Sequence, residues 1–380
     1  MKIAIVTETF LPSTDGVVTR LKACVRHFVK EGHEVRVIAP DLGVYEFEGV
    51  KIEGVPARTL PFYRSKKFAL PNPLVKDILH NYDPDIVHVV NPAILGLSGV
   101  YYTKKLGYPM IASYHTNVAQ YLDYYNLSPF KFLIWWYFRK LHNHAELNLC
   151  TSQTVKKELD ERGFRNVHVW KRGVDTDLFH PDKFDTDMRA RLSNGQPEKK
   201  LLLFVGRLAA EKEIEKIKSV LERSDEFVLA VVGDGPHRQE LEKHFAGTNT
   251  VFTGLLHGEE LARAYASSDV FVFPSTTETL GLVITEAMAS GLPLIAAESG
   301  PTCEQIEHNH NGLLYDPSKA DDFTETLLKF KDETLRERLA KAARKEIADM
   351  GWNAQSRQVL DLYKEVLYAE EGNNEATGLI

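Results

Sequence analysis

Residues 2–7 of the chain read KIAIVT, a short apolar run that stops at polar residues and precedes a helical stretch at 19–32. A continuous apolar run of this kind is typical of a strand buried on both faces of a parallel sheet. The next run, EVRVIAP at 34–40, completes a strand–helix–strand unit. Further runs of the same kind occupy residues 86–90, 109–113, 147–151 and 167–170. The pattern predicts a parallel sheet wound by helices.

The alternation starts again near Lys199, where LLLFVG at 201–206 is the new first strand. Apolar runs at 227–232, 250–254 and 270–274 continue it. A chain of 380 residues, 43% hydrophobic and 26% charged, is also too long for one ordinary core. We therefore predict an α/β fold of two Rossmann-like, doubly wound parallel-sheet domains that face each other across a cleft.

Composition shifts suggest where these domains begin and end. We expect an N-terminal domain over residues 1–180, a polar linker containing Pro and Gly over 181–198, and a C-terminal domain over 199–352. A helix at 353–368 is expected to pack back on the N-terminal domain. The remaining residues, 369–380, are acidic and rich in small side chains, which favours a disordered tail.

The N-terminus has too short an apolar run for a secretory signal peptide. The densest apolar run, 132–138, is far shorter than the roughly 18 residues that a spanning helix needs. The three cysteines lie far apart, which fits neither a disulfide framework nor a zinc cluster. We expect a cytoplasmic protein.

The two halves of the chain differ in charge. Residues 1–180 contain 23 Lys and Arg against 18 Asp and Glu, whereas the remainder contains 23 against 35. A basic N-terminal half suits an anionic partner, although surface charge also differs between domains for no functional reason. Nothing in the sequence indicates a nucleic acid.

The strongest local signal is ETLGLVITEAMASG at 278–291. A polar loop follows a strand here, and an apolar helix begins near Leu280 and Gly281. Free backbone N–H groups at such a helix start form an anion site, and a glycine lets a phosphate approach closely. Glu278 and Glu286 are suited to accept hydrogen bonds from the vicinal hydroxyls of a sugar and a ribose. The alternative is two ordinary surface glutamates.

A second signal, GRLAAEK at 206–212, directly follows the first strand of the second half. Arg207 at the strand end and Lys212 five residues later can reach one diphosphate. The alternative is a solvated helix start among charged neighbours.

Together these stretches resemble the retaining glycosyltransferases of GT-B fold and family 4 type, over nearly the whole chain. The glutamate pair followed by AMASGLP is the most specific piece. Other matching motifs are ETFLP with DGVV (8–12 and 15–18), YHT (114–116), RGVD (172–175), VGDGP (232–236) and GLL (312–314). The chain looks most like members that act on lipid or lipid-linked acceptors, such as GDP-mannose-dependent mannosyltransferases and diacylglycerol glucosyltransferases.

The resemblance implies roles for residues of the N-terminal, acceptor-side domain. Gly16 and Val17 form a loop close to the diphosphate and the acceptor. His115 contacts the transferred sugar and is a catalytic residue. From its position alone, His115 is as well explained by a satisfied core histidine.

The resemblance also implies a donor site in the C-terminal, nucleotide-sugar-binding domain. Arg207 and Lys212 neutralise the diphosphate leaving group. Glu286 binds the ribose, and backbone around 254–256, including Leu256, receives the base. The catalytic residue Glu278 holds sugar hydroxyls and phosphate together with the backbone of Leu280, Gly281 and Leu282. The family usually has glycine where this chain has Glu213, which places a carboxylate beside Lys212.

The expected substrates are a UDP- or GDP-linked sugar and a hydroxyl acceptor, and we expect no cofactor. Three Asp-x-Asp sequences, at 83–85, 175–177 and 185–187, are poorly placed for a metal site, and we expect no metal. The aromatic and basic stretch 130–140 is either a buried helix or a surface for peripheral contact with an anionic membrane at its inner face.

Three other functions remain open. A sugar-nucleotide epimerase shares this fold, and a non-catalytic sugar-nucleotide-binding protein would use the same donor residues. A nicotinamide dehydrogenase fits the winding, but the first strand leads into Thr7-Glu8-Thr9-Phe10 without the glycine-rich fingerprint.

Overall fold

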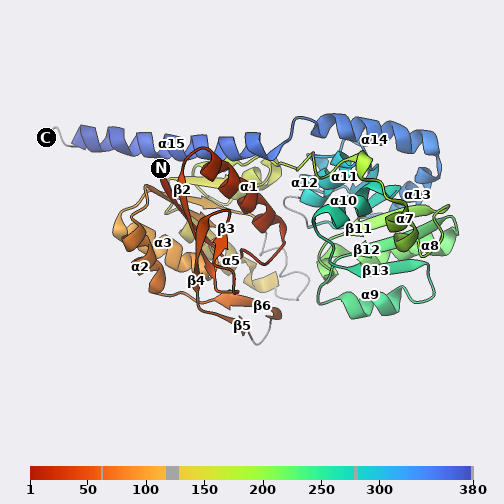
Figure 1. Ribbon diagram of the computed structural model, residues 1–380, viewed down its shortest axis with the longest axis horizontal. Coiled ribbons are helices and arrows are strands. Elements are labelled where there is room, and N and C mark those ends of the chain that lie inside the picture. Colours follow the sequence, from red (N-terminus) through yellow and green to blue (C-terminus); the bar gives the residue numbers. More distant parts are fainter. Residues whose placement is uncertain (61–62, 117–127, 278–280, 378–380) are drawn as a thin grey trace. The chain divides into compact units, whose positions relative to one another are not determined.

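A computed structural model describes residues 1–60, 63–116, 128–277 and 281–377. The chain divides into two compact units, which are described separately (Figure 1). The first unit comprises Met1–Arg172 and the C-terminal segment from Trp352, and the second comprises Gly173–Gly351. The chain therefore leaves the first unit after Arg172 and returns to it at Trp352.

Among the described residues of the first unit, eight strands form a sheet in the order β10-β9-β8-β7-β1-β2-β4-β3. Neighbouring strands are parallel, except that β3 runs antiparallel to β4. The strands are β1 (Lys2–Thr7), β2 (Glu34–Pro40), β3 (Glu46–Phe47), β4 (Val50–Val55), β7 (Ile86–Val90), β8 (Met110–Ser113), β9 (Leu147–Cys150) and β10 (Val167–Val169). A separate antiparallel pair joins β5 (Ala57–Leu60) to β6 (Tyr63–Ala69).

The alternation of buried side chains along β1 shows why this strand reads as a continuous apolar run. Ile3 and Ile5 belong to one core cluster and Ala4 and Val6 to another, on opposite faces of the sheet. Both faces are covered by helices: α1 (Gly16–Lys30), α2 (Leu74–Tyr82), α3 (Leu95–Leu106), α5 (Lys131–His142), α6 (Gln153–Glu161) and α15 (Trp352–Thr377), with a 3-10 turn η1 (Ser128–Phe130).

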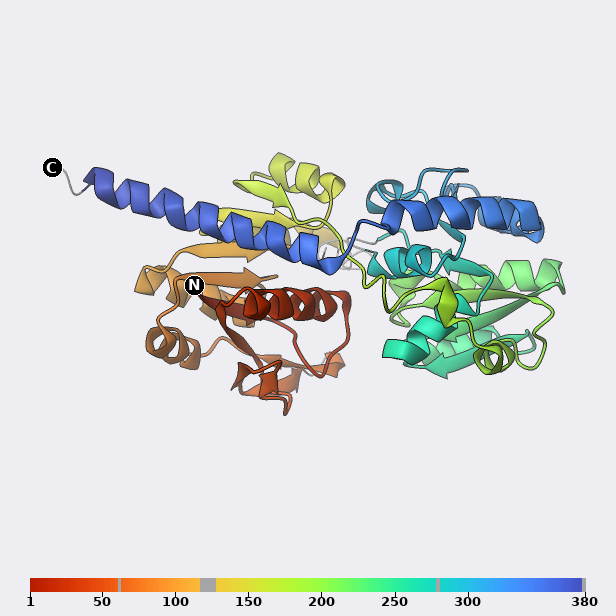
Figure 2. The same cartoon turned by 45° about the horizontal axis from the view of Figure 1, so that its top comes forward.

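The C-terminal helix α15 packs beside α1 and completes the core of the first unit (Figure 2). Val359, Leu360 and Tyr363 are buried there with Phe28 of α1. Burying each large side chain contributes about 1.5–3 kcal/mol. The helix extends to Thr377, so the predicted disordered tail is wrong for the described part of that segment. Ala and Glu are strong helix formers, and a helix already anchored by packing propagates at little cost.

In the described part of the second unit, six parallel strands form a sheet in the order β13-β12-β11-β14-β15-β16. The strands are β11 (Lys200–Val205), β12 (Phe227–Val232), β13 (Thr250–Gly254), β14 (Val270–Phe273), β15 (Leu294–Ala297) and β16 (Leu313–Tyr315). The order reverses between β11 and β14. In open α/β sheets, ligands bind at the carboxyl ends of the strands beside such a reversal.

Helices cover both faces of this sheet too. Successive side chains of β11 are therefore buried alternately in two core clusters, one on each face. They are α7 (Thr186–Leu192), α8 (Lys218–Arg223), α9 (Arg238–His244), α10 (Gly258–Ala266), α11 (Leu282–Ala289), α12 (Gly300–Cys303), α13 (Asp322–Leu328) and α14 (Glu333–Ile347). Short 3-10 turns are η2 (Pro181–Lys183), η3 (Ala210–Lys212), η4 (Ile214–Ile217) and η5 (Lys329–Lys331).

The prediction of a linker at 181–198 is wrong. Asp185 caps α7, and Met188 and Leu192 of α7 are buried in a core cluster of the second unit. Two apolar side chains in a seven-residue helix give too weak a periodicity to be recognised, so the capping aspartate was the only usable signal.

Candidate active site

The reversal point of the second sheet brings the predicted phosphate residues together. Arg207 follows β11, and Lys212 ends η3. The Lys212 ammonium lies 5.7 Å from the ring centroid of Phe273, the last residue of β14, so it stays at the same edge. Arg207 donates to the carboxylate of Glu211, whose side chain is buried. The ion pair holds the half-buried guanidinium in one orientation.

Two glycines let the loop after β12 lie directly against the Arg207 loop. A Cβ at Gly233 would lie 1.9 Å from the carbonyl oxygen of Gly206, and one at Gly235 would lie 2.2 Å from that of Leu208. Backbone hydrogen bonds join the same segments, including Leu208 N–H to the Asp234 oxygen at 3.0 Å. The VGDGP motif therefore serves a close backbone contact beside the phosphate residues.

The loop after β14 is fastened to η3 by its hydroxyl groups. Ser275 and Thr277 donate to the carbonyl oxygen of Glu211 at 3.2 and 3.4 Å. Thr276 donates to the carboxylate of Glu213 at 3.0 Å. The predicted residues Glu278 and Leu280 lie outside the described residues.

Helix α11 begins at Leu282, two residues later than its expected start. Gly281 is its N-cap and has a left-handed backbone (φ 63°, ψ 45°), a conformation that glycine adopts without strain. The first-turn N–H groups of α11 point toward the strand-end edge, where they can bind an anion. Gly281 and Leu282 therefore lie at the start of α11, and their binding of phosphate stays a prediction.

Glu286 is held one turn into α11 by a tyrosine. The Tyr265 hydroxyl, which is fully buried, donates to its carboxylate at 2.9 Å. Burial raises the pKa of Glu286 to about 7, and the Tyr265 hydrogen bond opposes this rise. The pair presents a carboxyl group that changes charge near neutral pH. Leu256, the predicted base-side residue, is buried just beyond β13 at the same edge.

In the first unit, Gly16, Val17 and the predicted histidine lie at one sheet edge, but the prediction of a loop at 16–17 is wrong because these residues begin α1. Asp15 caps α1 by accepting from Val18 N–H at 3.1 Å, so Gly16 and Val17 form the first turn of that helix after β1. His115 lies two residues beyond the end of β8 and is buried. Asn91, which follows β7, accepts from the backbone N–H of His115 at 3.2 Å.

His115 belongs to a buried chain of hydrogen bonds that sequence reasoning missed. Its Nε2 lies 3.0 Å from Ser113 Oγ, which in turn lies 2.8 Å from Nε2 of His88. The Nδ1 atom of His88 lies 2.6 Å from the hydroxyl of Tyr363 on α15. Because the partners are up to 275 residues apart, no local pattern could have found them.

Burial, with a smaller contribution from a buried arginine, lowers the pKa of these histidines. Arg20 stacks 3.9 Å over the Trp170 ring and donates to the carbonyl oxygens of Trp170 and Lys171. Burial lowers the pKa of His88 to about 3, with Arg20 adding to the effect. Burial and the same cation lower the pKa of His115 well below its usual value. Both rings are therefore neutral at pH 7.

Glu8, which belongs to the matched ETFLP motif, has a structural role. Its carboxylate accepts from the backbone N–H groups of Ala93, Ile94, Leu95 and Gly96 at 2.7–3.1 Å. It thereby fills the anion site at the start of α3 from within the protein. Desolvation nevertheless raises the pKa of this buried carboxyl.

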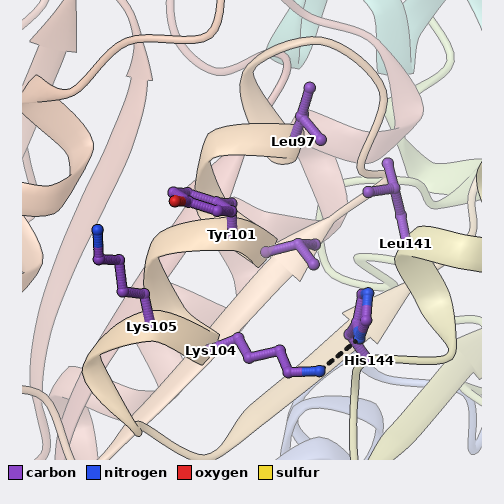
Figure 3. Close-up of a pocket in the computed structure, with 7 residues that line it drawn as sticks. Leu97, Tyr101, Lys104, Lys105, Leu141 and His144 are labelled. Carbon is purple, nitrogen blue, oxygen red and sulfur yellow. Dashed lines mark hydrogen bonds between the residues drawn. The ribbon is translucent and has the colours of Figure 1, made fainter.

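The aromatic helix α5 is only half buried, so of the two alternatives for this stretch a wholly buried helix does not apply. Trp135 and Phe138 belong to a core cluster, whereas Phe132 is 73% exposed and Trp136 49% exposed. Nearby, a pocket of about 400 Å³ lies between α3 and the end of α5 (Figure 3). It is lined by Leu97, Val100, Tyr101, Lys104, Lys105, Leu141 and His144.

The Asp-x-Asp sequences have local structural partners. Asp85 accepts from Lys2 N–H at 2.7 Å, Asp175 from Leu178 N–H at 3.0 Å, and Asp185 from Met188 N–H at 2.7 Å. Within the described ranges, no three His, Cys, Asp or Glu side chains are grouped to hold a metal ion. Over the same part of the chain, no helix is both long and apolar enough to cross a bilayer.

Comparison with known proteins places the chain in a family. Residues 14–178 match the family described as Glycosyltransferase Family 4, and residues 188–346 match Glycosyl transferases group 1. A GDP-mannose-dependent alpha-mannosyltransferase of Corynebacterium glutamicum is 36% identical over 97% of this chain and 89% of that protein. The chain belongs to the family 4 glycosyltransferases. The predicted family and enzyme class are confirmed.

Two other relatives carry glycosyl-transfer names, and the name of one of them includes a diacylglycerol lipid. A sulfoquinovosyl transferase of Arabidopsis thaliana is 37% identical over 90% of this glycosyltransferase and 69% of the relative. An alpha-monoglucosyldiacylglycerol synthase of Streptococcus pneumoniae is 28% identical over 83% of this chain and 75% of that protein. None of these relatives supports the epimerase alternative.

Solved structures confirm the fold. Sucrose-phosphate synthase from Thermosynechococcus elongatus matches with a TM-score of 0.79 at 20% identity, covering 97% of this chain and 99% of that one. Anabaena HepE in complex with UDP and glucose matches with a TM-score of 0.78 at 18% identity, covering 96% and 99%. The glycosyltransferase therefore has the GT-B architecture of two Rossmann-like domains, as predicted.

Proposed function

We propose that this glycosyltransferase moves a hexose from a UDP- or GDP-linked sugar to a hydroxyl of a lipid or lipid-linked glycan, with retention of anomeric configuration. The observation that carries the proposal is the grouping of Arg207, Lys212, the α11 N-terminus and Glu286 at the reversal edge of the second sheet. Cationic side chains, backbone N–H groups and a hydrogen-bonding carboxylate are the groups that a nucleotide diphosphate sugar requires.

In this proposal, the departing diphosphate is stabilised by charge and dipoles of the protein. Arg207 and Lys212 supply the positive charge, and the first turn of α11 supplies N–H donors. Glu286 in its ionised form accepts from the ribose hydroxyls. A donor phosphate oxygen takes the proton of the acceptor hydroxyl as it attacks on the face that the diphosphate leaves, so that no protein base is required.

His115 is the proposed catalytic residue of the first unit. Its low pKa keeps the ring neutral, which suits a hydrogen bond to an uncharged sugar hydroxyl and avoids a cation beside the glycosyl centre. Ser113 and His88 hold the ring in place. Glu278 remains a proposed sugar-binding residue at the loop before α11.

The donor proposal is tested first by thermal unfolding with a panel of UDP- and GDP-sugars. A ligand at a hundred times its dissociation constant adds about 2.7 kcal/mol of stability, which raises the unfolding midpoint measurably. Arg207→Ala should abolish this shift. No shift with any donor, or an undiminished shift in the variant, would contradict the proposed site.

The catalytic assignment is tested by transfer assays with a lipid acceptor. His115→Ala should lower kcat by at least about a hundredfold, the usual contribution of a positioned catalytic group. His80→Ala is the matched control, because His80 is an exposed histidine of the same unit. Full activity of His115→Ala would remove His115 from the mechanism.

We also propose that α5 contacts an anionic membrane that carries the acceptor. Exposed Phe132 and Trp136 lie on a helix with Lys131, Arg139 and Lys140 and no acidic residue. Aromatic and basic side chains suit the headgroup region. The pocket at the end of α5 adds a lysine rim, where Lys104 Nζ lies 3.1 Å from Nδ1 of His144.

Flotation with liposomes that contain an anionic lipid tests this contact. The double variant Phe132→Ser/Trp136→Ser should lose binding, whereas Tyr368→Ser, an exposed aromatic residue of α15, should bind as wild type does. Binding by the wild type at low salt should weaken at high salt, because the basic side chains are screened. Equal flotation of all three proteins would exclude α5 as the contact.

A further inference from the structure

Glu213 occupies a backbone conformation that suits glycine. Its φ of 52° and ψ of 35° place it in the left-handed region between η3 and η4. The Cβ of an L-residue is disfavoured there, and the short side chains of Asn and Asp, which can hydrogen-bond the nearby backbone, adopt this conformation more readily than the longer glutamate. The resemblance described above places a glycine at this position in most family members. The chain thus retains a strained residue beside the phosphate lysine.

The carboxylate of Glu213 forms two hydrogen bonds that glycine could not form in this conformation. Oε1 accepts from the hydroxyl of Thr276 at 3.0 Å, and Oε2 accepts from the ammonium of Lys216 at 2.5 Å. Thr276 belongs to the loop that follows β14 and leads toward the start of α11. The carboxylate therefore joins the two segments on either side of the sheet reversal.

This contact completes a row of three. The hydroxyls of Ser275 and Thr277, on either side of Thr276, both donate to the carbonyl oxygen of Glu211. Those two bonds use backbone oxygen and are available whatever residue stands at 213. The Thr276 bond exists because residue 213 has a carboxylate.

A carboxylate beside Lys212 would repel a diphosphate if its charge were not compensated. The ion pair with Lys216 compensates the charge of Glu213. Lys216 lies one turn further along the chain and neutralises Glu213 at close range. The negative charge is therefore compensated within the turn, and Lys212 remains directed along the ring of Phe273.

We propose that Glu213 is a positioning residue for the donor: by accepting from Thr276, it fixes the loop after β14 relative to the phosphate-binding turn 207–212. The inference rests on the proposed donor site. A fixed spacing holds the sugar-binding and diphosphate-binding groups at once, which lowers the ordering cost when the donor binds. Local strain that the surroundings maintain is typical of such positions.

The test compares the thermal stability of a variant with its catalytic efficiency, because a positioning residue should affect only the second. Glu213→Gly removes the carboxylate and relieves the backbone, so its unfolding midpoint should equal or exceed that of wild type. Its kcat/KM for the donor should nevertheless fall about tenfold, the effect expected from losing one hydrogen bond to a charged group. A merely structural glutamate would instead lose stability, or leave kcat/KM unchanged.

Three variants separate the causes. Thr276→Val removes the same hydrogen bond without altering residue 213, and should lower kcat/KM by a similar factor. The double variant with Glu213→Gly should be no worse than either single one. Glu213→Gln keeps an oxygen acceptor for Thr276 and should retain at least about half of the wild-type kcat/KM. Unchanged kcat/KM in Thr276→Val, or a tenfold loss in Glu213→Gln, would overturn the proposal.

Glu48→Gly is the matched control, because Glu48 also has a φ of 52° but lies in the turn between β3 and β4 of the first unit. It should leave kcat/KM unchanged. Arg207→Ala distinguishes a failure of the Glu213 proposal from a failure of the proposed donor site. If it abolishes donor binding while Glu213→Gly is fully active, the Glu213 proposal alone fails. If Arg207→Ala binds and transfers as wild type does, the proposed donor site fails.

Discussion

Lowering the pH from 8 to 6 should weaken donor binding, because Glu286 loses the charge with which it accepts ribose hydroxyls. Its pKa is raised to about 7 by burial, against the Tyr265 hydrogen bond. By mass action, roughly nine tenths of the molecules are ionised at pH 8 and roughly one tenth at pH 6. If the ionised form alone binds, the apparent Kd rises about tenfold over this range.

The stability of the ligand-free protein should change in the opposite sense. The pKa of Glu286 in the folded state lies above its ordinary value of 4.5, so the folded protein holds a proton that the unfolded chain releases. The stabilisation is fully present below about pH 4.5 and is lost as the pH rises through about 7. At 1.36 kcal/mol per pKa unit, the whole effect is about 3 kcal/mol.

Titration calorimetry with GDP and with UDP at pH 6, 7 and 8 measures the binding effect. At pH 7, binding should release about half a proton, which is detected by comparing buffers of different ionisation enthalpy. Glu286→Gln should bind with little pH dependence. Tyr265→Phe removes the bond that lowers the pKa, so its midpoint should move to higher pH. A constant wild-type Kd, or a tenfold change that persists in Glu286→Gln, would refute the reasoning.

Tyr363→Phe should lower kcat for transfer severalfold while lowering the free energy of unfolding by only about 1 kcal/mol. The Tyr363 hydroxyl holds His88, which is linked through Ser113 to His115. Unchanged kcat would contradict this role. Gly235→Ala should cost about 3 kcal/mol or more by calorimetry, since its Cβ would meet a carbonyl oxygen at 2.2 Å. Gly351→Ala, where a Cβ meets no atom within 4 Å, should change stability by less than about 0.5 kcal/mol. Glu8→Ala should cost about 2 kcal/mol in the same measurement, since four N–H groups lose their acceptor.

The fold could be predicted because its signals are local. Apolar runs such as 2–7 and 201–206 mark β1 and β11, and each occupies the centre of its sheet next to the reversal of strand order. Residues directly after such strands must then lie at the ligand edge. Arg207 and His115 were located by this rule together with the family motifs.

What the sequence could not predict depends on contacts between distant residues. Tyr363 reaches His88 because α15 crosses back onto the first unit, and nothing in the periodicity of α15 distinguishes this tyrosine from a packing residue. The contacts of Glu213 could not be predicted from spacing either. A carboxylate next to Lys212 suggests repulsion, but the left-handed backbone turns it toward Thr276 and Lys216.

The same electrostatics decides which group controls the pH dependence of transfer. A loss of activity below pH 7 is ordinarily attributed to a histidine, and His115 is at hand. Here burial, and to a lesser extent the Arg20 cation, keeps the pKa of His115 well below 6.5, so its ring stays neutral while Glu286 titrates. The acid limb of the pH–rate profile should therefore disappear in Glu286→Gln and persist in Ser113→Ala, which changes the hydrogen bonding of His115 and His88 but leaves Glu286 intact. Persistence of the limb in Glu286→Gln would return the assignment to a histidine.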